Sequence, residues 1–332
     1  MDCHLCGAAE CAVRALVTAE FTDDGVRRLE ALGLQVTRAG WGTTRRALDA
    51  AALVEAAAGV EVLVTELEVV DAGVLAALPA LRLVATARGG PVNVDLAACA
   101  ARDVPVVFTP ARNADSVADF VLGVLLSTSR GIAAAERHLR SQGWHVDGEL
   151  PYLHFRGREL AGLVLGVVGY GAVGRRVTQR ARDGFGMTVL FTDPYVDGGV
   201  PFDELLERCD VVSLHCPRSA GTAALLDEAA LRRMRRGSVL INTAGGSMVD
   251  EAALVRALRD GHLSGAALDV FATEPLPRDS DLLSAPNLLL TPHLAGAALD
   301  VVRHHSDMVC DDVERWLRGE PLVHQASCSA TS

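Results

Sequence analysis

The chain has 332 residues, of which 50% are hydrophobic, so it is long enough for about two domains that each bury a core. Charged residues make up 22%, and this mixture excludes a disordered chain. With 31 Lys and Arg against 42 Asp and Glu, the formal net charge is −11, which argues against a nucleic acid or an anionic membrane as the main partner.

The N-terminus and the cysteines bear on the cellular compartment. Charged residues interrupt the first part of the chain, which lacks the apolar core of a secretory signal. Eight unevenly spread cysteines in a chain of this length do not indicate a disulfide framework, so we expect reduced thiols and a cytoplasmic protein. Cys3, Cys6 and Cys11 crowd the N-terminus, but a structural zinc site usually draws on a second ligand pair. A loose tail with ordinary thiols and no metal is the favoured interpretation.

The first third of the chain alternates apolar runs with amphipathic segments, which indicates βαβ units and a parallel sheet. We expect strands at 13–17, 60–65, 83–86 and 104–108, and helices at 23–32 and 72–78. A long helical region follows at about 114–139, and its first part is apolar on more than one side. Both an ordinary core helix and a helix at a domain junction or dimer interface fit that pattern. The non-periodic stretch 142–158 is interpreted as a connection or arm.

From residue 160 onward the alternation is clearer. We expect strands at 164–168, 188–192, 211–215, 239–242, 266–270 and 288–291. Six such strands separated by helical segments are typical of a doubly wound dinucleotide-binding sheet. The 3–4 spacing of apolar residues predicts a last helix at 299–317, and the polar tail beyond it is expected to be loose.

A glycine-rich turn is the clearest motif. Gly169-Tyr170-Gly171-Ala172-Val173-Gly174 follows an apolar strand and precedes a helical segment at 175–181. In that context the glycines permit a tight turn and close approach of backbone to a pyrophosphate, which the helix N-terminus attracts. Asp193 ends the next strand, where a carboxylate binds ribose hydroxyls and repels a 2′-phosphate. The motif therefore predicts NAD rather than NADP.

An acid and an imidazole follow two later strands. Glu274 and His293 come just after the predicted strand ends, where open α/β sheets place their ligands. Reducing a ketone with NADH builds negative charge on the carbonyl oxygen, and a protonated imidazole can donate to that oxygen while a carboxylate orients it. In the reverse direction, neutral His293 removes the hydroxyl proton. We interpret this pair as the catalytic acid and base.

These motifs resemble those of the D-isomer-specific 2-hydroxyacid dehydrogenases, the family that includes phosphoglycerate dehydrogenase. The resemblance covers about 84–321 and is carried by TARGGPVNVDLAACAARDVPV, TPARNADSVADFVLG, LGVVGYGAVGRRV, SLHCP, LINTA, GAALDVF and LTPHLAG. It implies an α/β fold of two doubly wound parallel-sheet domains. A Rossmann NAD domain at 110–297 would be inserted in a flavodoxin-like substrate domain made of 1–109 and 298–332. It also implies a homodimer whose core includes the helix near 116–129.

The same resemblance assigns roles by position. It implies that His293 and Glu274 form the acid–base pair, with His293 beside the cofactor. The loop that offers N–H groups to the substrate carboxylate matches Gly89 and Gly90. The further contacts to NAD match Cys216, Thr243, Ala244 and Asp269.

One position departs from the family pattern. The family motif N-T-A-R-G carries an arginine that clamps the substrate carboxylate, and this chain has Gly245 in its place. Three interpretations stay open. Arg88 or Arg112, both in motifs expected near the substrate, could replace that arginine; the substrate could be unusual, such as a phosphonate or a bulky intermediate; or the chain could bind NAD as a sensor or scaffold with little turnover. The expected function is the interconversion of a 2-hydroxy acid, or an analogue, and its 2-oxo compound.

Overall fold

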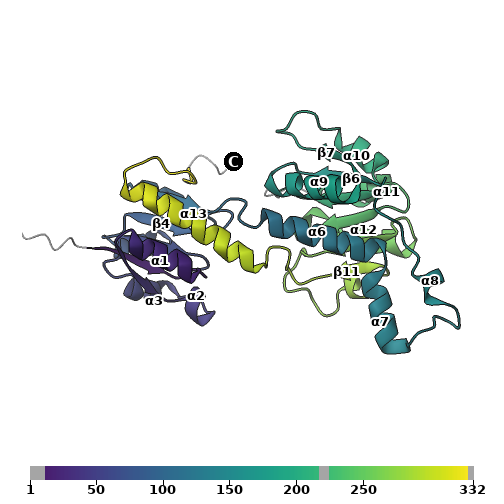
Figure 1. The fold of residues 1–332 in the computed structure, drawn as a ribbon, viewed down its shortest axis with the longest axis horizontal. Coiled ribbons are helices and arrows are strands. Elements are labelled where there is room, and N and C mark those ends of the chain that lie inside the picture. Colours follow the sequence, from purple (N-terminus) through teal and green to yellow (C-terminus); the bar gives the residue numbers. More distant parts are fainter. Residues whose placement is uncertain (1–11, 217–223, 328–332) are drawn as a thin grey trace, which may run out of the picture. The chain divides into compact units, whose positions relative to one another are not determined.

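The computed structural model describes residues 12–216 and 224–327 and divides into two compact units (Figure 1). The first unit takes in the described residues up to Asn113 and those from Ala298 onward, and the second is Ala114–Ala297. Each unit contains one sheet, and every strand pair in both sheets is parallel. Cys3, Cys6 and Cys11, for which ordinary thiols without a metal are expected, lie outside the described residues.

The first unit has a five-stranded sheet in the order β2-β1-β3-β4-β5. This is the flavodoxin-like order 2-1-3-4-5, in which the strand order reverses between β1 and β3 and ligands gather beyond the carboxyl ends. The strands are β1 Val13–Val17, β2 Leu34–Arg38, β3 Val62–Thr65, β4 Leu83–Thr86 and β5 Val106–Phe108. The predicted fold class is confirmed for this unit, although the sequence pattern did not predict β2.

Helices cover both faces of this sheet. Along β1, Ala15 and Val17 pack into one buried cluster and Leu16 into the other, as the two-residue repeat of a strand requires. Helices α1 and α13 pack together on the first of these faces. The helices are α1 Asp23–Ala31, α2 Trp41–Thr44, α3 Ala50–Ala56, α4 Ala72–Ala77, α5 Leu96–Ala100 and α13 Leu299–Leu317.

The second unit has a six-stranded sheet in the order β11-β10-β9-β8-β6-β7. The strand order reverses between β6 and β8, so the carboxyl ends of these two strands mark the switch point where such sheets bind ligands. Beyond β7, Val200 N donates to Phe191 O at 2.8 Å, which fastens the loop after β7 to that edge strand. The strands are β6 Val164–Val168, β7 Thr188–Thr192, β8 Val211–Leu214, β9 Val239–Asn242, β10 Gly265–Leu268 and β11 Leu288–Leu290.

Two helical layers enclose this second sheet. Residues of α6 and α9 contribute to one buried cluster, and residues of α10, α11 and α12 to the other. Figure 1 shows α6 lying beside α9, and these two helices contact each other. The helices are α6 Ala114–Ser129, α7 Ile132–Gln142, α8 Pro151–His154, α9 Ala172–Phe185, α10 Phe202–Arg208, α11 Glu228–Arg233 and α12 Glu251–Arg259, with 3-10 turns at Gly246–Met248 and Asp281–Ser284.

The long helical region expected at 114–139 is two helices rather than one. Helices α6 and α7 meet at 57°, and Gly131 between them has φ +63°. A glycine adopts this left-handed conformation without steric cost, so the chain turns there. Among the described residues, no single helix is long and apolar enough to cross a membrane; the bent pair passes that test only in combination.

Candidate functional site

The glycine-rich turn has the geometry that a dinucleotide requires. Gly169 has φ +92°, and a Cβ on it would lie 2.5 Å from the backbone N of Cys216. A Cβ on Gly174 would collide with Gly169 O, so only glycine lets α9 approach β6 so closely. Around Gly171 the space is open, and no side chain caps the N-terminus of α9 there. The free N–H groups of the first turn of α9 can therefore receive a diphosphate.

Asp193 follows β7 and is held by backbone donors. Its Oδ2 accepts from Tyr170 N at 2.7 Å, and its Oδ1 accepts from Tyr195 N at 2.9 Å. Each carboxylate oxygen has a second lone pair, so both remain able to accept from ribose hydroxyls. The Arg175 guanidinium lies over the Tyr170 ring, 4.7 Å from its centroid, and Arg176 pairs with Asp115 at 3.3 Å. The negative charge of Asp193 faces no ion-pair partner among the described residues, which favours NAD.

Two orphaned polar atoms lie beyond the neighbouring strands. In the β8–β9 register Leu214 is opposite Asn242, so the residues that follow, His215 and Thr243, leave the sheet side by side. Thr243 Oγ1 and His215 Nδ1 are buried and have no hydrogen-bond partner among the described residues. Burial lowers the pKa of His215 to about 4, so this imidazole is neutral. Unpaired buried polar atoms are costly, and a polar group of a bound dinucleotide would satisfy them. The chain's residues therefore fit NAD.

His293 and Glu274 point at each other. His293 Nδ1 lies 2.9 Å from Glu274 Oε2, and the other oxygen, Oε1, accepts from Phe271 N at 3.0 Å. The hydrogen bond from His293, followed by that from Phe271 N, lowers the pKa of Glu274, so this carboxylate is ionised at neutral pH. Because the carboxylate can only accept, Nδ1 carries the proton and Nε2 is left for a reacting group. The His293 side chain is 64% exposed, so a substrate can reach Nε2.

Asp269 holds the loop that carries His293. This residue is 2% exposed, and its Oδ1 accepts from Thr291 Oγ1 and from Leu294 N, both at 2.7 Å. Its Oδ2 accepts from Ala295 N at 2.8 Å. The resemblance implied that Asp269 contacts the nicotinamide side of NAD. In the structure, its carboxylate anchors the turn from which the imidazole of His293 projects.

The structure leaves room for a side chain at Gly245, where the family motif has its arginine. Gly245 has φ −166°, an extended conformation that any residue adopts, and a Cβ there would come no closer than 3.6 Å, to Met248 Cγ. The buried Asn242 shapes this turn, because its Oδ1 accepts from Ala244 N and Gly245 N. The next glycine differs, since a Cβ on Gly246 would collide with the carbonyl group of Phe271. Backbone geometry therefore requires glycine at 246 but not at 245.

In the first unit, charged side chains follow four neighbouring strands. Glu20, Glu66, Arg88 and Arg112 come after the carboxyl ends of β1, β3, β4 and β5. Both guanidinium nitrogens Nη1 and Nη2 of Arg112 lie 3.4 Å from Glu66 Oε1, and Arg88 Nη1 donates to Glu66 O at 3.4 Å. Among the described residues, Arg88 has no ion-pair partner. The structure thus brings the two predicted arginines around Glu66, a residue that the sequence analysis missed.

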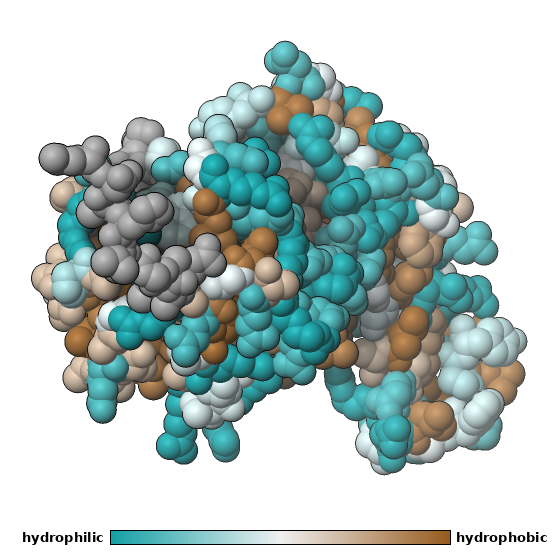
Figure 2. Space-filling view, turned by 60° about the vertical axis from the view of Figure 1, so that its left-hand side comes forward, coloured by the Kyte–Doolittle hydropathy of each residue, from teal (hydrophilic) through white to brown (hydrophobic). Residues whose placement is uncertain are grey.

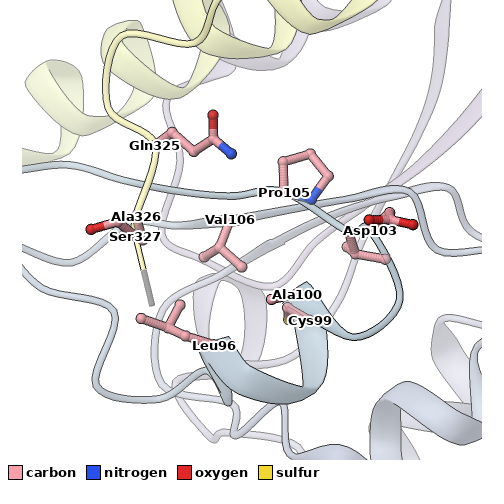
Figure 3. A pocket seen from close by; sticks show the side chains of 10 residues that line it. Leu96, Cys99, Ala100, Asp103, Pro105, Val106, Gln325, Ala326 and Ser327 are labelled. Carbon is pink, nitrogen blue, oxygen red and sulfur yellow. The ribbon is translucent and has the colours of Figure 1, made fainter. Parts of the chain in front are cut away.

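The loop after β4 is spacious. Around Gly89 and Gly90, an added Cβ would meet no atom within 4 Å. A ligand can therefore approach the backbone of this loop, as the resemblance implied for a substrate carboxylate. A separate cavity of about 600 Å³ lies in the same unit (Figure 3), between α5, β5 and the tail segment 325–327. Within the part of the chain that the structure describes, Asp103 is the only charged residue that lines this cavity and no predicted site residue lines it, which does not suit an acid substrate.

Comparisons with known proteins agree with this geometry. Residues 122–295 match the family model of the NAD-binding domain of the D-isomer specific 2-hydroxyacid dehydrogenases. A Bacillus subtilis (strain 168) protein named as a 2-hydroxyacid dehydrogenase, YoaD, is 36% identical over 95% of this chain and 93% of its own length. The D-3-phosphoglycerate dehydrogenase of Mycobacterium tuberculosis (strain ATCC 25618 / H37Rv) is 40% identical over 78% of this chain, which spans 49% of that protein.

The fold matches solved structures along nearly the whole chain. The TT0316 protein from Thermus thermophilus superposes with a TM-score of 0.80 at 34% identity, covering 95% of this chain and all of that one. The cofactor turn, the acid–imidazole pair and these similarities point to one group of enzymes. The chain belongs to the D-isomer-specific 2-hydroxyacid dehydrogenase family and is an NAD-dependent oxidoreductase that acts on CH–OH groups.

Proposed function

We propose that the chain interconverts a 2-hydroxy acid, or a close analogue such as a phosphonate, and the corresponding 2-oxo compound, with His293 and Glu274 as its acid–base pair. The observation that carries this proposal is the 2.9 Å contact between His293 Nδ1 and Glu274 Oε2, which leaves Nε2 available. A protein that only binds NAD has no need of such a pair. Bound NAD supplies the nicotinamide that accepts or donates the hydride.

The protein's own part is to move one proton. In the oxidative direction, neutral His293 accepts the hydroxyl proton at Nε2, and the ionised Glu274 stabilises the imidazolium that results. In the reductive direction, the same Nε2–H donates to the carbonyl oxygen as negative charge develops on it. Asp269 contributes indirectly, because the bonds that it accepts from 291–295 hold the His293 turn in place.

The acid group of the substrate needs a cation in place of the family arginine. We propose Arg88 and Arg112 for this role, with the N–H groups of the Gly89–Gly90 loop, because Arg88 has no ion-pair partner among the described residues and Arg112 is only loosely paired. The name of the mycobacterial relative, a D-3-phosphoglycerate dehydrogenase, supports a small anionic acid as substrate. A second candidate, an NAD-responsive sensor with little turnover, is favoured only by the glycine at 245.

The test is NADH oxidation with a panel of 2-oxo acids (glyoxylate, pyruvate, phosphohydroxypyruvate) and a 2-oxo phosphonate. The enzyme account predicts saturable turnover of at least one member. NADH binding is measured in parallel by fluorescence. If the folded protein binds NADH and turns over none of these compounds, the dehydrogenase proposal fails and the sensor remains.

We also propose that the protein is a homodimer. Among the described residues, six of the fifteen exposed large hydrophobic side chains fall within 132–153, on α7, α8 and the loop between them. On the face shown in Figure 2, hydrophobic residues reach the surface among hydrophilic ones. The resemblance implies a second copy of the chain as the partner, with the helix near 116–129 in the dimer core, and the exposed residues follow directly after that helix. The six residues are Ile132, Leu139, Trp144, Leu150, Tyr152 and Leu153.

A further inference from the structure

Arg112 is held in an unusual way. Its side chain is 19% exposed, and a single oxygen, Glu66 Oε1, lies 3.4 Å from both Nη1 and Nη2. A tight charge-assisted hydrogen bond is about 2.7–2.9 Å long, so Glu66 compensates this cation only loosely. Burial raises the pKa of Glu66 and lowers the pKa of Arg112, so the structure bears a cost in keeping this pair charged. A half-buried, loosely paired guanidinium retains the capacity to bind a further anion.

His305, on α13, provides the third contact. Its Nδ1 lies 2.5 Å from Arg112 Nη1, and its Nε2 lies 2.6 Å from Glu20 O. A guanidinium can only donate and a carbonyl oxygen can only accept, so Nδ1 is the acceptor and Nε2 carries the proton. His305 is 1% exposed, and burial lowers its pKa to about 4, which agrees with a neutral ring. The imidazole therefore donates a hydrogen bond from Nε2 to Glu20 O and accepts one at Nδ1 from Arg112 Nη1.

These contacts use one part of the guanidinium and leave another free. Glu66 occupies the end between Nη1 and Nη2, and His305 takes the outer hydrogen of Nη1. Among the described residues, Nε–H and the outer hydrogen of Nη2 have no partner. These two parallel N–H groups form one side edge of the planar, fork-shaped guanidinium. That edge can donate two hydrogen bonds at once, one to each of two oxygens of a carboxylate or phosphonate.

We propose that Arg112 clamps the acid group of the substrate through this free edge, in place of the arginine that Gly245 lacks, and that Glu66 and His305 are positioning residues which fix the guanidinium. This inference rests on the proposed function, and assigns the clamp to one arginine with two named supports. Arg88 then contributes charge nearby rather than the two-point contact. Glu66 and His305 act only through Arg112.

The experiment measures the dissociation constant of oxamate, a 2-oxo acid mimic that is not reduced, from the NADH complex, together with kcat and KM for glyoxylate. The variants are Arg112→Lys, which keeps the charge and loses the fork, His305→Phe, and the two combined. We expect each single change to weaken oxamate binding about tenfold or more, with NADH affinity unchanged. In the combined variant, oxamate should bind no more weakly than in Arg112→Lys, because His305 has no fork left to position.

Two further variants separate positioning from a structural role. His305→Asn keeps an acceptor near the Nδ1 position and should restore part of the oxamate affinity that His305→Phe loses. His304 is the matched control, because its Nδ1 contacts Arg112 O at 3.0 Å and not the guanidinium. We expect His304→Phe to bind oxamate as the wild type does. A KM for glyoxylate that rises with little change in kcat supports a binding role for the cluster.

The outcomes distinguish this inference from the proposed function. If the combined variant loses oxamate affinity by the product of the two single losses, His305 acts independently of Arg112. That result overturns the inference. Unchanged oxamate binding in Arg112→Lys, or no oxamate binding by the wild type, overturns it as well. Oxamate coupling as predicted with no turnover of any 2-oxo compound supports the clamp and contradicts the dehydrogenase proposal.

Discussion

Hydrogen bonds to Asp269 hold the backbone of His293 and of the residues that follow it in place. Its φ is +56°, in the left-handed region where a residue other than glycine costs about 1–3 kcal/mol. Its backbone N donates to Asp269 O at 2.9 Å, and the Asp269 carboxylate binds the residues around it. These hydrogen bonds offset the strain and direct the ring toward Glu274. The sequence motif LTPHLAG identified the imidazole, but not the role of Asp269 as the anchor of its loop.

The room for a side chain at Gly245 allows a test of whether another arginine already binds the acid group of the substrate. If Arg112 already binds the acid group, Gly245→Arg should raise kcat/KM for glyoxylate by less than about tenfold, since the new arginine duplicates an existing contact. Gly245→Gln is the matched control, with a long side chain and no charge, and both variants should fold because φ at 245 is extended. A gain of a hundredfold or more from the arginine would mean that no other group had replaced it.

Among the elements, the predicted strands and helices that carry the core were found within a few residues of their expected bounds. Strands β6 and β9 were predictable because they are nearly continuous apolar runs that are buried on both faces. Strand β2, with the sequence LQVTR, was not predicted because it is a mostly exposed edge strand with few apolar residues. The break between α6 and α7 at Gly131 was missed because apolar residues continue past it.

The Arg112 cluster could not have been predicted from the sequence as a cluster. Glu66 and His305 are 46 and 193 residues away from Arg112, and only the parallel order of β3 and β5 with the packing of α13 brings them together. One sequence feature could have indicated Glu66 as a site residue: it follows the end of the buried strand β3, as Arg88 follows shortly after the end of β4. Spacing along the chain carries no information about such a pairing, whereas the glycine turn is local and was found.

At the scale of elements, Glu68 ties the segment 40–48 to the first sheet. It is 1% exposed and accepts from Thr18 Oγ1 at 2.7 Å and from Trp41 N at 3.0 Å. Burial raises the pKa of Glu68, but the hydrogen bonds outweigh that effect and leave its pKa below the usual value. Because the folded-state pKa is lowered, its stabilisation is present above the ordinary carboxyl pKa and is lost as the pH falls through the folded-state value.

We therefore expect Glu68→Gln to lower the free energy of unfolding by about 1–3 kcal/mol at pH 7. The difference between wild type and variant should shrink as the pH falls through the lowered folded-state pKa of Glu68, because protonation of the carboxyl removes its stabilisation. Denaturant unfolding over a series of pH values from 7 downward measures it. The exposed Glu55→Gln on α3 is the control, with an expected change within about 0.5 kcal/mol. A Glu68→Gln cost that is independent of pH would contradict this account.

For the whole molecule, the two sheets have the orders expected of a doubly wound α/β protein, and the predicted fold class is confirmed. The NAD-binding part could be predicted because its motifs are short and continuous in the chain. Before about residue 84 the chain carries little signature, so the flavodoxin-like order β2-β1-β3-β4-β5 of the first sheet was implied by the resemblance and not by the local sequence pattern.

The homodimer is a prediction at this scale. Trp144 and Tyr152 are 65% and 64% exposed in a monomer, and burying such aromatic surface drives association. Light scattering after gel filtration should give twice the mass of the chain for the wild type, and the monomer mass for a variant with both residues changed to Glu. Tyr195→Glu, an exposed aromatic elsewhere on the second unit, should remain dimeric. A monomeric wild type would contradict the proposal.

The central claim is that His293, oriented by Glu274, transfers the proton of the reaction. The most direct measurement is the rate of NADH oxidation with a 2-oxo acid by His293→Asn, since asparagine tolerates the left-handed backbone at this position and preserves the loop. We predict that turnover falls by about 10²–10⁴-fold while the dissociation constant of NADH stays within about twofold of the wild type. Turnover close to that of the wild type, or loss of NADH binding together with activity, would contradict the account.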